Sequence, residues 1–167
     1  MEYLDLYDEN KVLTGKKIIR GKGKPVVPAN NYIKVVVIFI QNDEGKFLFQ
    51  VTSKNKGNEI ATTGGHVKSG QTSFETVLSE VKEELGIDIS NENVVMIDSY
   101  IFDIAIIDTY YLKKDIEIKD LVLQKEEVAD VLWLTIGEIT DSIEQGKVRE
   151  MNIKAFEMIL SHLENKK

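Results

Sequence analysis

The sequence predicts an α+β protein that folds as an α/β/α sandwich. Segments rich in β-branched and aromatic residues lie on both sides of one amphipathic helix near the middle of the chain. Two further helical segments follow the last of these strands. The chain has 167 residues, of which 43% are hydrophobic, so it can bury a substantial core. We therefore expect a single domain over residues 1–167.

The first part of the chain is expected to form strands. Residues 2–7 and 12–20 flank the turn-forming sequence Asp8-Glu9-Asn10, which predicts an N-terminal hairpin within residues 1–24. The segments that follow are a strand over 32–40, a turn over 42–45, a strand over 46–52, a polar loop over 53–59, and a short strand leading into a glycine loop at Gly64-Gly65-His66.

The central helix carries clear signals at both ends. Thr72 is a favourable N-cap, Glu75 completes a capping box with it, and Gly86 suits the position just after the helix. Its expected apolar stripe consists of Phe74, Val77, Leu78, Val81 and Leu85.

The rest of the chain returns to strands and then ends in helices. Strands are expected over 94–102, 104–112 and 130–134. A short helix is expected over 136–145, ending at Gly146. The last helix presents an apolar face made of Met151, Phe156, Ile159, Leu160 and Leu163.

Three carboxylates share one side of the central helix. Glu80, Glu83 and Glu84 are spaced three and four residues apart, and no Lys or Arg stands at those distances to neutralise them. Like charges at this spacing cost about 0.2–0.5 kcal/mol per pair. Hard cations such as Mg²⁺ bind oxygen ligands and bridge carboxylates to phosphates. The cluster therefore predicts a cation site, with Glu83 and Glu84 as its main ligands, although a solvated helix face is the simpler alternative.

Composition excludes several classes of function. A formal net charge of −7 argues against a nucleic-acid duplex as partner, because phosphate binding requires a basic face. The absence of cysteine excludes disulfides, thiolate metal sites and a cysteine nucleophile. The first residues do not resemble a signal peptide, and no apolar run approaches 18 residues. We expect a cytoplasmic protein that does not enter membranes.

The segment from Gly65 to Ile87 resembles the Nudix box. The two departures from the box are Gln71, where the family has Glu, and Ser79, where it has Arg. The Glu126–Leu134 segment is similar to the late Glu-rich loop and Trp-containing strand of the family. The matching box residues are Gly65, Glu80, Val81, Glu83, Glu84, Gly86 and Ile87.

The expected N-terminal hairpin resembles that of one particular subgroup of the family. Asp5-Leu6-Tyr7-Asp8 together with Thr14-Gly15 looks like the hairpin of the isopentenyl-diphosphate-isomerase-like Nudix subgroup. The resemblance implies a Nudix fold with a mixed central sheet, this hairpin and a C-terminal helix. It also implies a homodimer at the level of the family.

The resemblance implies an activity and a set of residues. The activity is Mg²⁺- or Mn²⁺-dependent hydrolysis of the diphosphate linkage in a nucleoside diphosphate joined to another moiety, by attack of water on phosphorus. The expected metal ligands are the Gly65 carbonyl, Glu80, Glu83 and Glu84. Glu80 is either a ligand or the base, and in some relatives a late-loop glutamate is the base, for which Glu126 and Glu127 are candidates. We include Glu127 with the three helix glutamates in the catalytic set.

Basic residues and a histidine are candidates for substrate binding. Lys54 and Lys56 lie in the loop after the second main strand, and His66 follows two glycines. We expect all three to contact the small-molecule substrate. The N-terminal segment is also basic, and we interpret it as a solvated hairpin in preference to a phosphate clamp; its residues are Lys16, Lys17, Arg20, Lys22 and Lys24.

Two other functions are weighed against hydrolysis. The first is a ligand-binding or regulatory module that retains the fold without turnover, for which Gln71 and Ser79 would be marks of decay. The second is isopentenyl-diphosphate isomerase, whose chemistry relies on a cysteine before the glycine loop. This chain has Thr63-Gly64 in that region and no cysteine, so the isomerase is disfavoured. The sequence does not identify the substrate.

Overall fold

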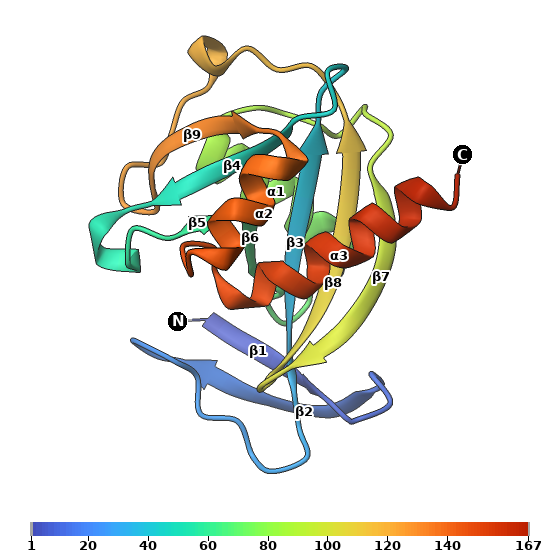
Figure 1. The fold of residues 1–167 in the computed structure, drawn as a ribbon. Coiled ribbons are helices and arrows are strands. Elements are labelled where there is room, and N and C mark those ends of the chain that lie inside the picture. The colour runs from blue at the N-terminus through green and yellow to red at the C-terminus, as the bar shows by residue number, and fades with distance from the viewer. Residues whose placement is uncertain (1, 167) are drawn as a thin grey trace.

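The computed structural model describes residues 2–166 and confirms the α+β prediction (Figure 1). The strands are β1 (Glu2–Tyr7), β2 (Leu13–Arg20), β3 (Ile33–Gln41), β4 (Phe47–Thr52), β5 (Ile60–Ala61), β6 (Thr63–His66), β7 (Val95–Phe102), β8 (Ala105–Lys113) and β9 (Val128–Leu134). The α-helices are α1 (Ser73–Leu85), α2 (Ile136–Glu144) and α3 (Glu150–Glu164). Two short 3₁₀ helices, Lys54–Lys56 and Ile118–Asp120, lie in loops.

The central sheet is mixed, as the family resemblance implied. Its main path runs β5-β4-β3-β8-β7, with β6 paired to β3 and β9 paired to β4. Strands β3 and β8 are parallel along their whole length, from Ile33 opposite Ala105 to Gln41 opposite Lys113. The other pairs in this sheet are antiparallel.

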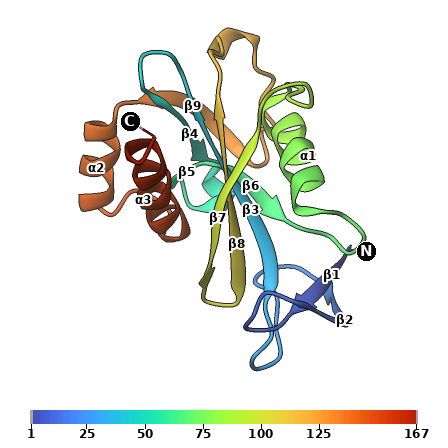
Figure 2. The same ribbon diagram turned by 90° about the vertical axis from the view of Figure 1, so that its right-hand side faces the viewer.

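Helices cover both faces of the sheet, which gives the sandwich its three layers. Figure 2 shows α1 on one side of the sheet and α2 and α3 on the other. The α1 side buries Val77, Val81 and Leu85 against strand residues such as Val36 and Ile38. The other side contains a cluster of edge-to-face aromatic rings formed by Phe39, Phe47, Phe49 and Phe156. Both cores follow the alternation of β3 side chains between the two faces.

The expected N-terminal hairpin is present and is attached to the main sheet. Strands β1 and β2 pair antiparallel in a separate two-stranded sheet. Reciprocal backbone hydrogen bonds join Tyr7 to Tyr32, immediately before β3. The backbone N–H of Ser69 donates to the carbonyl of Tyr3 at 2.7 Å. The hairpin is therefore fixed against both β3 and the loop that precedes α1.

Two local predictions were wrong. Gly64, Gly65 and His66 were expected in a loop, but they belong to β6 and pair with β3. The loop is confined to residues 67–72. Phe74 was expected in the buried stripe of α1, yet it is 42% exposed, because it lies at the first turn, where the helix extends past the core.

The helices give no sign of a membrane span. Among residues 2–166, none combines the length and the apolar composition that crossing a bilayer requires.

Candidate active site

A cavity of about 440 Å³ lies where the hairpin, β6 and α1 meet. Its walls carry Glu80, Glu83 and Glu84 from α1 and Gly65 and His66 from β6. The same cavity is bounded by residues from the hairpin, from β3 and β4, and from the loop before β9. The three helix glutamates thus border a cavity rather than a freely solvated face, although Glu83 itself is exposed.

Glu80 and Glu84 form a carboxyl pair one helical turn apart. Glu84 is only 7% exposed, and one of its oxygens accepts a 3.0 Å hydrogen bond from the side-chain amide of Gln50. Burial, reinforced by the hydrogen bond with Glu80, raises the pKa of Glu84 to about 9. Burial also raises the pKa of Glu80, and the charge of Glu83 contributes in the same direction. The pair therefore shares a proton near neutral pH, with Glu84 as donor.

Gly65 explains how the Glu80 side chain reaches the strand. Gly65 lies in β6 opposite Val36, and a Cβ atom built on it would overlap the carboxylate of Glu80. The glycine is required here for close approach rather than for a special backbone angle, since its φ is not in the left-handed region. The carboxylate of Glu80 consequently lies directly against the strand backbone.

The donor set fits a hard divalent cation. Among residues 2–166, no group of three or more His, Asp or Glu side chains is already arranged to hold a metal ion. Mg²⁺, however, is commonly bound by one or two carboxylates, with waters and substrate phosphates completing its shell. Two contacting carboxylates that must otherwise share a proton, facing a cavity, meet that requirement.

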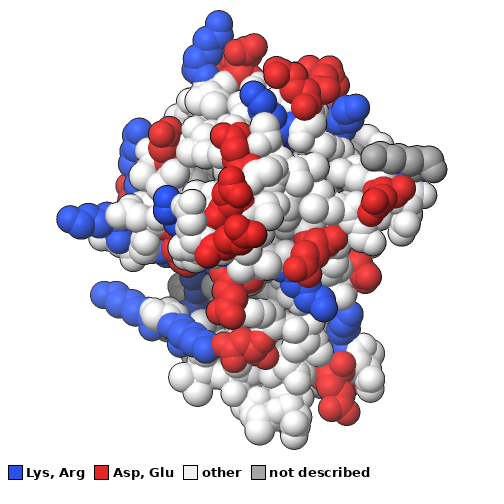
Figure 3. Space-filling view, in the orientation of Figure 1, with Lys and Arg blue, Asp and Glu red and all other residues white. Residues whose placement is uncertain are grey.

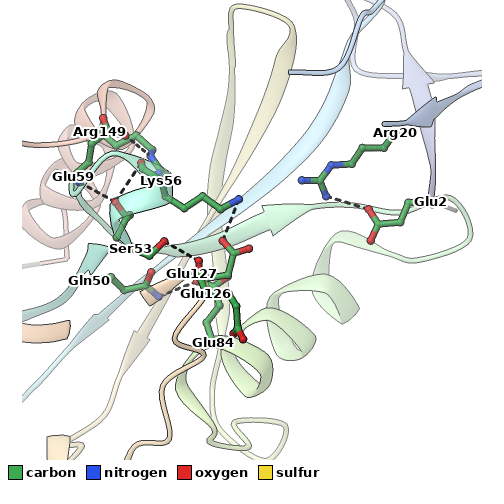
Figure 4. Close-up of polar contacts among 11 residues, drawn as sticks. Glu2, Arg20, Gln50, Ser53, Lys56, Glu59, Glu84, Glu126, Glu127 and Arg149 are labelled. Carbon is green, nitrogen blue, oxygen red and sulfur yellow. Dashed lines mark hydrogen bonds and ion pairs between the residues drawn. The ribbon is translucent and has the colours of Figure 1, made fainter. Parts of the chain in front are cut away.

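Glu127 and Lys56 bring the late loop and the segment after β4 to the cavity. Their side chains form an ion pair, with 3.4 Å between Lys56 Nζ and a carboxylate oxygen of Glu127 (Figure 4). Backbone contacts fix this arrangement, because the Ser53 N–H donates to the Glu127 carbonyl and the Ser53 hydroxyl donates to the Glu126 carbonyl. The Glu126 side chain is exposed and does not line the cavity.

The two other residues expected to bind substrate, His66 and Lys54, differ in whether they line the cavity. His66 lines the cavity, and burial, followed by the charge of Arg20, lowers its pKa to about 4, so the imidazole is neutral at physiological pH. Lys54 is exposed and does not line the cavity, so the expectation that it contacts substrate is not supported by its position. Lys54 and Lys56 share one 3₁₀ turn, and of the two only Lys56 lines the cavity.

The hairpin contributes more to the cavity than its basic composition suggested. Arg20, interpreted from the sequence as part of a solvated hairpin, lines the cavity together with Glu2, Lys24 and Lys68. Figure 3 shows Lys and Arg side chains gathered at the edge where the segment after β4 faces the hairpin. The resemblance of the hairpin was the one sequence signal that pointed toward these hairpin residues. It could not place them at the cavity, because the packing of the hairpin onto the loop before α1 is a tertiary contact.

Gln50, Gln124 and Arg149 also line the cavity and were not anticipated.

Comparison with known proteins places the chain in a family. A NUDIX domain matches residues 31–154, which include α1 and most of the sheet. The chain belongs to the Nudix family. It is 39% identical over 140 residues to an uncharacterized Nudix hydrolase of Listeria innocua, covering 81% of this chain and 80% of that protein. This Nudix protein is accordingly a hydrolase.

Solved structures agree with the fold. A Deinococcus radiodurans protein, DR0079, matches with a TM-score of 0.73 at 24% identity, over 88% of this chain and 91% of that one. The Nudix domain of Shewanella oneidensis NrtR, solved with ADP-ribose, matches with a TM-score of 0.64 at 14% identity, over 79% and 88%. These matches do not support the isopentenyl-diphosphate-isomerase-like subgroup, although the hairpin that suggested it is present.

Proposed function

We propose that this Nudix hydrolase cleaves the diphosphate linkage of a nucleoside diphosphate joined to another moiety, with Mg²⁺ or Mn²⁺ as its cofactor. The observation that carries the proposal is the Glu80–Glu84 carboxyl pair on the wall of a cavity that also carries basic side chains. An acidic wall suits a divalent cation, and Lys56, Lys68 and Arg20 suit the phosphate oxygens that accompany it.

Nudix hydrolases generally use divalent metals, and the residues that would hold one here are Glu80, Glu83, Glu84 and the Gly65 carbonyl. When bound, such an ion lowers the pKa of coordinated water and neutralises charge on phosphoryl oxygens. Gln50 orients the Glu84 carboxyl through its 3.0 Å hydrogen bond. Glu83, the most exposed of the three glutamates, immediately precedes Glu84 in α1 and also lines the cavity.

The proton of the attacking water needs an acceptor at the cavity. Glu127 is one candidate, because it lines the cavity within electrostatic reach of Glu80 and Glu84 and its backbone is fixed by Ser53. Glu80 is the other, because it is held against Gly65. Glu126 is not a candidate, since it is exposed and does not line the cavity. Neutral His66 can donate a hydrogen bond to a phosphate oxygen without adding charge.

The size of the cavity and one structural neighbour support a nucleotide derivative as substrate. A volume of about 440 Å³ lies within the range of small-molecule sites. ADP-ribose, present in the Nudix domain from Shewanella oneidensis, is a nucleoside diphosphate joined to a sugar. We therefore include ADP-ribose in the first substrate panel, beside nucleotide sugars, dinucleoside polyphosphates and nucleoside triphosphates.

A non-catalytic binding module is the second candidate, and the departures from the Nudix box favour it only weakly. Gln71 and Ser79 do not line the cavity. The Gln71 side chain instead lies near the start of α1, with its amide oxygen 3.4 Å from the Thr76 hydroxyl, which donates to the Thr72 carbonyl at 2.9 Å. Neither departure removes an acidic group from the cavity wall.

The test is phosphate or nucleotide release from that panel with Mg²⁺ or Mn²⁺. We expect metal-dependent release that is lost in Glu83→Gln and Glu84→Gln and retained in Glu126→Gln, the matched control outside the cavity. Ligand binding without release across the panel would instead support the binding module.

A further inference from the structure

One carboxylate in the cavity is shared by two basic side chains from different segments. Arg20 Nη1 lies 3.0 Å from one oxygen of Glu2, and Lys68 Nζ lies 3.2 Å from the other. All three side chains line the cavity that holds the helix glutamates. Figure 4 shows the Glu2–Arg20 pair facing the side of the cavity that carries Lys56, Glu127 and Glu84.

The backbone positions of the two basic residues are fixed independently of the Glu2 carboxylate. Arg20 lies directly opposite Glu2 in the β1–β2 ladder, so its position depends on strand pairing. Lys68 precedes Ser69, whose N–H donates to the Tyr3 carbonyl and whose hydroxyl donates to Asp5 at 2.7 Å. If the carboxylate of Glu2 moved away, strand pairing and the contacts of Ser69 would still keep Arg20 and Lys68 at the same wall of the cavity.

The Glu2 carboxylate can be exchanged for another anion at little cost. Between a third and a half of each side chain in the cluster is exposed, and ion pairs at such positions stabilise a protein by about 0–1 kcal/mol. A phosphate offers more charge and more acceptor oxygens than a carboxylate, and the planar guanidinium group matches it with two parallel hydrogen bonds. A phosphate group would therefore compete well for the place of Glu2.

We propose that Arg20 and Lys68 form a second anion-binding subsite, which the carboxylate of Glu2 occupies in the free protein and a phosphate group of the substrate takes over. The inference rests on the proposed function, because it supplies a place for charge beyond the linkage that is cleaved. Lys68 lies within electrostatic reach of Glu80 and Glu83, so the subsite adjoins the acidic wall.

The subsite narrows the substrate class. A substrate that ends in a phosphate beyond the cleaved linkage, such as a nucleoside triphosphate, would satisfy both Arg20 and Lys68. A nucleotide joined to an uncharged sugar would leave Glu2 in place. We therefore expect the protein to prefer the terminally phosphorylated class.

Binding of inorganic tripolyphosphate in EDTA, followed by isothermal titration calorimetry, tests the subsite without metal or turnover. Removing the internal competitor with Glu2→Gln is expected to tighten binding about 3- to 10-fold. Arg20→Gln and Lys68→Gln are each expected to weaken it about 10-fold or more, and Arg20→Lys less. Lys16→Gln removes the same charge from an exposed position of β2 outside the cavity and is expected to change binding less than about twofold.

Three results would overturn the subsite. They are no binding of tripolyphosphate by the wild type, no gain in Glu2→Gln, or equal weakening in Lys16→Gln and Arg20→Gln. A gain of affinity cannot arise from misfolding, so Glu2→Gln is decisive even if Arg20→Gln unfolds the hairpin. If the wild type hydrolyses a substrate but the Glu2, Arg20 and Lys68 variants bind tripolyphosphate as the wild type does, the subsite alone is rejected. If these variants bind tripolyphosphate as expected but the wild type hydrolyses no substrate of the panel, the proposed function alone is rejected.

Discussion

Gly65 and Glu80 lie so close together that a Cβ atom at position 65 would overlap the Glu80 carboxylate. The contact joins β6 to α1 and places one acidic side chain against the strand backbone at the cavity wall. The neighbouring Gly64 is equally tight, but a Cβ there would meet the backbone carbonyl of Val36. Two adjacent glycines thus serve different purposes, one for the position of a side chain and the other for strand pairing.

Gly65→Ala is therefore expected to lower activity more than stability. The added methyl group displaces the end of the Glu80 side chain, which can rotate, so the cost falls on the arrangement of the carboxyl pair. We expect a loss of about 10-fold or more in kcat/KM, because misplacing a catalytic group by about 1 Å costs up to about 100-fold. Steady-state kinetics and a thermal melt on the same preparation measure the two effects.

Gly64→Ala is the matched comparison, and it is expected to lower stability more than activity. Its methyl group meets backbone that cannot rotate away, and overpacking of this kind costs about 1–3 kcal/mol. For a protein of this size we expect Tm to fall by about 2–12 °C. Equal losses of Tm in the two variants would argue that Gly65 also serves only strand pairing.

The stability of the metal-free protein is expected to fall as pH rises. Burial raises the pKa of Glu84 to about 9, whereas the carboxyl ionises at its ordinary value in the unfolded chain. Between those values the folded state holds a proton that the unfolded state has lost, so stability is full below about pH 4 and declines toward pH 9. The slope is at most about 1.4 kcal/mol per pH unit from this group.

Thermal melts in EDTA across pH 5–9 measure this slope, and Glu84→Gln is its control. Gln cannot ionise, so the variant should melt above the wild type at pH 8 and show a flatter pH profile. Identical profiles for the two proteins would mean that Glu84 does not hold a proton in the folded state.

Divalent cations should offset the loss of stability that a rise in pH causes in the metal-free protein. An ion at the Glu80–Glu84 pair replaces the shared proton, so binding releases protons and strengthens as pH rises. We expect saturating Mg²⁺ to raise Tm more at pH 8 than at pH 6. Calorimetric titration in two buffers with different ionisation enthalpies counts the protons, and a count of zero at pH 7 would contradict the shared proton.

Glu127→Gln distinguishes the two candidates for the proton acceptor. If Glu127 accepts the proton, kcat should fall about 10²- to 10⁴-fold with little change in KM. Glu126→Gln alters the neighbouring residue, which does not line the cavity, and should leave kcat unchanged. A fall of less than about threefold in Glu127→Gln would assign the role to Glu80.

Local signals in the sequence predicted most of the fold. The Thr72–Glu75 capping box and the left-handed Gly86 bound α1 as expected. Turn chemistry likewise located the hairpin and the β3–β4 connection. Strand β6 escaped prediction because two glycines carry no side-chain pattern, and their strand geometry comes from pairing with β3.

The candidate site was predictable only where its residues are close in sequence. Glu80, Glu83 and Glu84 follow from helical spacing, whereas the Gln50 hydrogen bond to Glu84 joins different elements. Lys54 and Lys56 could not be separated by composition, because only the folded 3₁₀ turn and the ion pair with Glu127 place Lys56 at the cavity. The hairpin residues Glu2 and Arg20 meet Lys68 only after the hairpin has packed.

Binding of Mn²⁺, followed by electron paramagnetic resonance in wild type, Glu84→Gln and Glu126→Gln, tests the central claim most directly. If the Glu80–Glu84 pair holds the metal, Glu84→Gln should bind Mn²⁺ at least about 10-fold more weakly, and Glu126→Gln should match the wild type. Equal Mn²⁺ affinity in all three proteins would contradict the account, because the buried carboxyl pair would then not be a metal site.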